Sequence, residues 1–150
     1  MQTLTRYLSN IMNSTLLGLP REIKELIYFD ALSHAAEKIL ALPLSFEVKH
    51  INPNGVAALA KDVKFLVEFV EGLERGFMLR SNLEELEQTV ALMQSENHDE
   101  FFDISMRNKK YNRVDAMNGP VLLEKLTHTV EAPNRAAPAL ANFSSRFGLR

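Results

Sequence analysis

Residues 52–73 read NPNGVAALAKDVKFLVEFVEGL, and this stretch decides the fold. Asn52 can cap a helix whose first position is Pro53, where the missing amide hydrogen costs nothing. Apolar side chains then recur with alternating steps of three and four residues, at Val56, Leu59, Val63, Leu66, Val70 and Leu73. That spacing places them on one face of an α-helix. The stretch therefore predicts a long helix with one continuous buried seam.

Two aromatic side chains of the same stretch lie outside this seam. Phe65 and Phe69 stand one turn apart, roughly 100° or more from the middle of the seam at about 100° per residue. The helix therefore has two apolar faces, which allow two interpretations. Either the helix is central in a bundle and buries both faces, or Phe65 and Phe69 form an exposed patch for a partner helix or a GTPase switch region.

Two helices are predicted before this stretch. Residues 3–17 form the first, which ends where Gly18 supplies a left-handed position and Pro20 prevents continuation. Residues 21–42 form the second, which Pro43 ends. The residues of the second helix that are expected to point inward are Ile23, Leu26, Ile27, Leu32, Ala35, Ala36, Ile39 and Leu42.

Further helices are predicted in the second half of the chain. Ser81 and Glu84 form a capping-box pattern ahead of a helix over residues 82–94. A short helix is expected within residues 96–106, followed by a polar connecting loop over residues 107–112. Asn118 resembles a cap for the last helix, which continues to Val130. Prolines and scattered alanines then predict a flexible tail over residues 131–150.

These elements define an all-α fold. No segment alternates with period two between hairpin turns, so no strand pair is predicted. Helices with one apolar stripe and short connections pack as an antiparallel bundle, here of about six helices over residues 1–130.

Composition excludes several classes of protein. The 150 residues include no cysteine, which removes disulfide frameworks, thiolate zinc sites and cysteine nucleophiles. The net charge of −2 argues against a general nucleic-acid binder. No run approaches the roughly 18 apolar residues that a transmembrane helix needs. A single soluble, intracellular domain is the expected class.

Charge is unevenly distributed along the chain. Residues 1–106 contain nine Lys or Arg against sixteen Asp or Glu, whereas residues 107–150 contain eight against three. The second part begins with the basic side chains of Arg107, Lys109, Lys110 and Arg113. Either the acidic and basic stretches are solvated faces that attract each other within the fold, or the basic segment contacts an acidic partner or an anionic membrane surface.

The sequence contains no constellation for catalysis. The glycine-rich loops that hold phosphate groups in nucleotide enzymes are missing. His34, His50, His98 and His128 include no pair at the four-residue spacing that places two imidazoles around a metal ion. We therefore expect no catalytic residue, no metal site and no cofactor, which favours a protein-binding module.

Several segments together carry a family resemblance. They are residues 20–54, the Lys61-Asp62-Val63 segment with Glu68 and Phe69, and above all KYNRV at residues 110–114 and PVLLEKL at residues 120–126. The chain resembles the C-terminal domain of Sec-fifteen, the Rab-effector subunit of the exocyst vesicle-tethering complex. Animal members tend to carry Asn where this chain has Ala60, and they end in a long basic segment, so a fungal-type version is expected.

The resemblance implies a non-enzymatic protein-interaction domain, the C-terminal part of a longer, rod-like subunit. Its partners would be a secretory Rab GTPase in the GTP form and other exocyst subunits. It would be cytoplasmic, recruited to secretory vesicles and sites of exocytosis at the plasma membrane, with peripheral membrane association through its partners. The alternative is a structural assembly module that packs against other tethering subunits without GTPase contact.

The resemblance and the residue pattern meet on the predicted helix of residues 52–73. An effector helix meets the apolar switch surface of a GTPase with a small hydrophobic patch bordered by charges. The residues expected to contact the Rab are Ala60, Lys61, Lys64, Phe65, Glu68 and Phe69.

Overall fold

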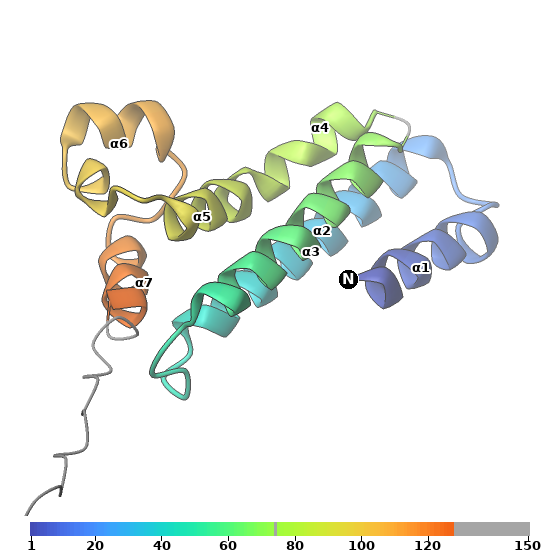
Figure 1. Ribbon diagram of the computed structural model, residues 1–150. Coiled ribbons are helices and arrows are strands. Elements are labelled where there is room, and N and C mark those ends of the chain that lie inside the picture. Colours follow the sequence, from blue (N-terminus) through green and yellow to red (C-terminus); the bar gives the residue numbers. More distant parts are fainter. Residues whose placement is uncertain (74, 128–150) are drawn as a thin grey trace, which may run out of the picture.

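The computed structural model describes residues 1–73 and 75–127, and these residues form an all-α bundle, as the sequence predicts (Figure 1). The predicted tail over residues 131–150 lies outside the described residues. The helices are α1 (Gln2–Asn10), α2 (Arg21–Leu44), α3 (Pro53–Glu71), α4 (Gly76–Arg80), α5 (Glu84–Gln94), α6 (Ile104–Lys110) and α7 (Asn118–Thr127). A π-helical turn follows α1 at Ile11–Thr15, and 3-10 turns precede α5 at Ser81–Leu83 and α6 at His98–Phe101.

Helix α3 forms as its sequence predicts. The Asn52 side-chain oxygen accepts a hydrogen bond from the Gly55 amide at 2.7 Å, and Pro53 occupies the first helical position. Val63, Leu66 and Val70 of the predicted seam are buried. They join buried residues of α2, α4 and α5 in the main hydrophobic core, which makes α3 the central helix of the bundle.

A second, smaller core lies at the C-terminal end of α5. It consists of Leu92, Phe101, Tyr111, Val114 and Leu123. Figure 1 shows α6 and α7 at this end of the bundle, far from α1. The Lys125 ammonium fastens α7 to the end of α2 by donating hydrogen bonds to the Pro43 and Ser45 carbonyl oxygens at 2.8 and 2.9 Å.

The first two helices end at Thr15 and Leu44 instead of at the predicted residues 17 and 42, and the predicted reasons for their ends were wrong. The first helix closes with a π-helical turn, in which the Leu16 amide donates to the Ile11 carbonyl at 3.1 Å, and none of the described glycines has a positive φ. Gly18 therefore adopts no left-handed conformation. Helix α2 includes Pro43 and ends at Leu44. A proline this close to the end of a helix removes only one late hydrogen bond, and Lys125 satisfies the carbonyl of Pro43 itself.

The predicted inward face of α2 is correct only in part. Leu32, Ala36 and Ile39 are buried, but Ile23, Leu26, Ile27 and Leu42 are exposed. The geometry of a helix explains the difference, because nine residues separate Ile23 from Leu32 and place them about 180° apart around the axis. Apolar residues on opposite sides of one helix cannot both reach the same core. The outer side of α2 therefore presents apolar surface.

The predicted capping box at Ser81 was also wrong. Ser81 has helical dihedral angles, φ −54° and ψ −27°, and its hydroxyl donates to the Met78 carbonyl at 2.8 Å. It lies inside a nearly continuous helical path from α4 through the 3-10 turn into α5. Helix α4 had no counterpart in the sequence prediction. It begins after Arg75, which has a left-handed φ of 58°.

The segment around residues 96–118 differs from its prediction in two places. The expected loop over residues 107–112 is largely helical, because α6 continues to Lys110, and Asp103 caps α6 by accepting from the Met106 amide at 2.9 Å. Asp115 replaces Asn118 as the capping side chain of α7. Its carboxylate accepts from the amides of Met117 and Asn118 at 2.7 and 3.0 Å.

Glu85, in the first turn of α5, gives a pH-dependent prediction. Burial, and then the negative charges of Asp115 and Glu37, raise its pKa above the ordinary 4.5. The folded state therefore binds more protons than the unfolded state from pH 4.5 up to the raised pKa, so this group lowers the free energy of unfolding as pH rises through that window. Glu85→Gln is expected to unfold at a higher urea concentration than wild type at pH 7, with the difference vanishing below pH 4.5.

The matched control for this prediction is Glu96→Gln, which changes an exposed carboxylate beyond the end of α5. Urea unfolding of both variants at pH 4 and pH 7, followed by circular dichroism, is the measurement. An equal difference from wild type at both pH values in Glu85→Gln would contradict the assigned shift.

Candidate partner-binding surface

The solvent-facing side of α3 forms a ridge between two grooves. Lys61, Lys64 and Glu68 are exposed on the ridge, where Lys64 Nζ lies 3.9 Å from a Glu68 carboxylate oxygen. One groove separates α3 from α1 and the other separates α3 from α5. All three ridge residues border both grooves, so one partner seated on the ridge would contact all of them.

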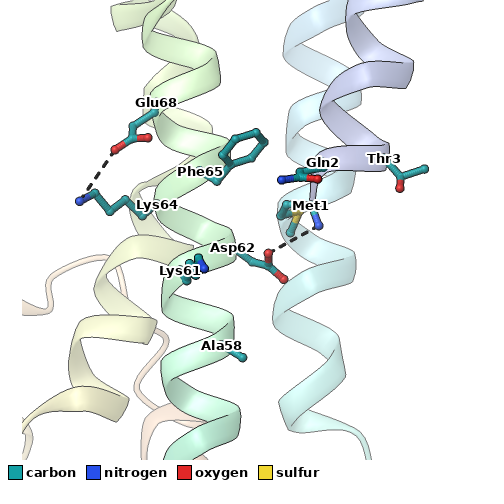
Figure 2. Close-up of a pocket in the computed structure, with 9 residues that line it drawn as sticks. All are labelled: Met1, Gln2, Thr3, Ala58, Lys61, Asp62, Lys64, Phe65 and Glu68. Atoms are coloured by element: carbon teal, nitrogen blue, oxygen red, sulfur yellow. Dashed lines mark ion pairs between the residues drawn. The ribbon is translucent and has the colours of Figure 1, made fainter.

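The groove between α3 and α1 encloses about 720 Å³ and contains Phe65 (Figure 2). The Phe65 ring is 39% exposed and projects from α3 toward the start of α1. The Met1 ammonium lies 3.6 Å from the Asp62 carboxylate and links the two helices. The groove is lined by Met1, Gln2, Thr3, Ala58, Lys61, Asp62, Lys64, Phe65 and Glu68.

The groove between α3 and α5 has a similar volume of about 740 Å³. Its floor is made of small apolar residues that include Ala60, Val63 and Val67. Its far rim is a charge network in which the Arg80 guanidinium pairs with Glu71 and with both carboxylate oxygens of Glu87, at 3.1 and 3.3 Å. On this side, the charged residues that border the groove are therefore already paired with one another.

The structure brings together some of the predicted contact residues and separates others. Lys61, Lys64 and Glu68 share the ridge, Phe65 faces the α1 groove and Ala60 faces the α5 groove. Phe69 is half-buried and packs against the main core. Phe69 therefore agrees with the interpretation of a central helix that buries both faces. Phe65 remains accessible, as the interpretation of an exposed patch requires.

Sequence reasoning missed several residues of the α1 groove. Ala58 and Asp62 precede Phe65 by seven and three residues, a helical spacing that could have identified them as its neighbours. Met1, Gln2 and Thr3 could not have been found this way, because only the packing of α1 on α3 brings them to the groove.

The basic segment after residue 106 is largely paired with the acidic stretch that precedes it. Lys110 Nζ lies 2.6 Å from Glu100, and Arg113 Nε lies 2.9 Å from Glu84. The Arg107 guanidinium lies 5.8 Å from the centre of the Phe101 ring. Among the residues that the structure describes, only the Lys109 ammonium of this set has no partner. Contact of the segment with an anionic surface stays a prediction.

Within residues 1–73 and 75–127, no group of three or more histidine, aspartate or glutamate side chains is placed to hold a metal ion. No helix in these same ranges has the length and hydropathy that a bilayer span requires. The α3 ridge and the α1 groove beside it offer charged side chains next to a partly exposed aromatic ring. That arrangement can bind a complementary protein surface.

Two curated relatives are similar to this chain. Exocyst complex component SEC15A of Arabidopsis thaliana is 25% identical over 134 residues, which cover 83% of this chain and 17% of the relative. Exocyst complex component SEC15B of the same plant is 23% identical over 125 residues, covering 79% and 16%. The chain thus spans less than a fifth of the length of these relatives. No solved structure matches it.

The family described as exocyst complex subunit Sec15 C-terminal matches residues 1–125. The matched residues include the KYNRV segment and nearly all of PVLLEKL, so the resemblance inferred from the sequence is confirmed. The expectation of a fungal-type version stays a prediction, which two plant relatives do not test. Because the match covers most of its length, this chain belongs to the Sec15 C-terminal family of exocyst subunits.

Proposed function

We propose that this chain is a non-catalytic protein-interaction domain of an exocyst subunit that binds a secretory Rab GTPase in its GTP form. In this role it helps to tether secretory vesicles to the plasma membrane during exocytosis. Membership of the Sec15 C-terminal family supports the tethering role, as do two relatives that are named exocyst complex components. Other exocyst subunits are further proposed partners.

The exposure of Phe65 in the α1 groove, beside the charged α3 ridge, carries the Rab proposal. Effector helices recognise a GTPase by placing an apolar side chain on its switch surface. The switch surface adopts its binding conformation only while GTP is bound. Phe65 supplies the apolar contact, and Lys61, Lys64 and Glu68 supply the charged border. The start of α1 supplies a second wall against which the partner can pack.

The proposed location follows from the proposed partner. A domain that binds a Rab on the vesicle surface is cytoplasmic and is recruited to vesicles and to sites of exocytosis. Its membrane association is then peripheral and depends on its partners. An assembly module without GTPase contact is the rival function, and it differs by being indifferent to the nucleotide that a Rab carries.

Removing the Phe65 ring should weaken Rab binding. Phe65→Ala is expected to raise the dissociation constant for a GTP-loaded secretory Rab by at least about tenfold, because a central aromatic contact is commonly worth 1.4 kcal/mol or more. Lys64→Glu should lower the association rate several-fold at low salt, because it reverses a charge at the border of the contact. Isothermal titration and stopped-flow binding are the measurements.

Phe46→Ala is the matched control. Phe46 is a more exposed phenylalanine, in the connection between α2 and α3, and it lies outside the lining of the α1 groove. Its removal should leave the dissociation constant unchanged. Wild-type affinity in both Phe65→Ala and Lys64→Glu, with unchanged circular dichroism, would exclude the α3 ridge as the Rab contact.

A further inference from the structure

A further groove lies where α7 ends. It encloses about 390 Å³ between the start of α3, the end of α5 and the end of α7. Its remaining lining side chains are polar and include no carboxylate, ammonium or guanidinium group, whereas six of its lining residues are apolar. These six are Ile51, Pro53, Val56, Ala57, Met93 and Leu126. The groove therefore favours apolar side chains as its occupant.

The position of Leu126 links this groove to the residues that follow α7. Leu126 lines the groove and α7 ends at Thr127, so the chain continues into residues 128–150 from the edge of the groove. A segment tethered this closely has an effective concentration on the order of 1 mM, which any separate occupant has to overcome. Any chain that precedes residue 1 would instead join at Met1, which lines the α1 groove and not this one.

The last part of the chain has the sequence of a short amphipathic helix. Residues 138–150 read PALANFSSRFGLR. Leu140, Phe143 and Phe147 recur with steps of three and four residues, a spacing that places apolar side chains on one side of a helix. Pro138 suits the first turn of such a helix. The segment can therefore offer one leucine and two phenylalanine side chains to an apolar groove.

The charge of this segment is opposite to the charge beside the groove. The segment contains two arginines and no acidic residue. On the α5 side of the groove, residues 81–106 contain no lysine or arginine, and the carboxylates of Glu96 and Asp99 form no ion pair with a described residue. On the α7 side, the charges of Glu124 and Lys125 cancel. A basic occupant is therefore attracted to the α5 side.

We propose that residues 138–150 of this chain bind the groove between α3, α5 and α7 as a short helix. Phe143 and Phe147 enter the groove beside Met93, and the arginines of the segment lie toward its acidic α5 side. The bound segment fastens the end of α7 to α3 and α5. Its residues lie beyond the family match, which ends at residue 125, and its binding does not depend on the Rab contact at the α3 ridge.

The NMR signal of the Met93 methyl group in the full 150-residue chain tests the proposal. A phenyl ring beside a methyl group shifts its proton resonance, so Phe143→Asp should move the Met93 signal, and by the same amount at every protein concentration. Leu149→Asp is the matched control and should leave the signal in place, because nine residues separate Leu149 from Leu140 and place it about 180° away around a helix. An unmoved signal in Phe143→Asp would overturn the proposal. A shift that disappears on dilution would also overturn it, because the segment would then bind a second copy.

Photo-crosslinking in the whole subunit distinguishes this segment from other occupants of the groove. The photoreactive amino acid p-benzoylphenylalanine replaces Phe143, and the purified subunit is irradiated and digested. The expected adduct joins the probe to a peptide that contains Met93 or Leu126, and the same probe at Leu149 should give little of it. An adduct only with parts of the subunit outside residues 1–150, or no adduct with the groove, would refute the proposal. Neither result depends on whether the chain binds a Rab.

Discussion

Gly76→Ala is expected to unfold the turn between α3 and α4 and to cost more than about 4 kcal/mol of folding free energy. A Cβ atom at position 76 would lie far inside van der Waals contact of the Val70 carbonyl oxygen. It would also lie 2.9 Å from the Val70 carbonyl carbon and 3.0 Å from the Glu71 Cα. All three are backbone atoms of α3, so no side chain can move away to relieve the clash. Because small domains are stable by only about 5–15 kcal/mol, most of the cooperative unfolding transition should be lost.

Urea unfolding followed by circular dichroism measures this effect, and Gly18→Ala provides its control. A Cβ atom at position 18 would meet nothing within 4 Å, and Gly18 has no positive φ. Its replacement should leave stability unchanged or raise it by about 0.4–1 kcal/mol through the unfolded state. Unfolding of Gly76→Ala at the same urea concentration as Gly18→Ala would contradict the close approach of residue 76 to the backbone of α3.

Phe101→Ala should have the second largest effect, a loss of about 3–5 kcal/mol. Phe101 is 1% exposed and is the most deeply buried aromatic side chain of the smaller core. Its ring lies 6.1 Å from the Tyr111 ring between centroids, and Gly119 leaves the space that its far edge fills. Removing the ring opens a cavity among the other residues of this core, which include Leu92 of α5 and Leu123 of α7. We therefore expect α6 and α7 to separate from α5 at lower urea concentrations than in wild type.

The adjacent Phe102 is the control for this prediction, because it is mostly exposed. It contacts Phe101 only edge to face, with ring centroids 5.9 Å apart. Phe102→Ala should cost about 1 kcal/mol or less, the value of one aromatic pair. Equal losses in the two alanine variants would show that the smaller core is not organised around Phe101.

The parts of the fold that depend on local chemistry could be predicted from the sequence. Helix α3 is the clearest example, since Asn52, Pro53 and a regular seam all point to the same element and the structure agrees with each of them. Ser81 failed as a cap because the same residue types also occur inside helices, where the hydroxyl donates to a carbonyl of the preceding turn. Whether Ser81 caps a helix or lies inside one depends on whether α4 precedes it. The sequence of α4 contains no pattern that predicts a helix.

The candidate site shows the same division. The positions of Lys61, Lys64 and Glu68 on one ridge follow from helical spacing alone. The separation of Phe65 from Phe69 does not, because it depends on where α1 lies and on how far the main core extends. One of the two sequence interpretations was that the acidic and basic stretches attract each other within the fold. The ion pairs of Glu84 with Arg113 and of Glu100 with Lys110 agree with that interpretation.

If the proposed function is correct, the chain distinguishes the nucleotide state of a Rab. Calorimetric titration with a secretory Rab of the same organism, loaded in parallel with a non-hydrolysable GTP analogue and with GDP, tests it most directly. We expect binding in the GTP form and at least about tenfold weaker binding in the GDP form, a difference of 1.4 kcal/mol or more. Equal binding in both forms, or no binding in either by the folded chain, would contradict the claim and favour the assembly module.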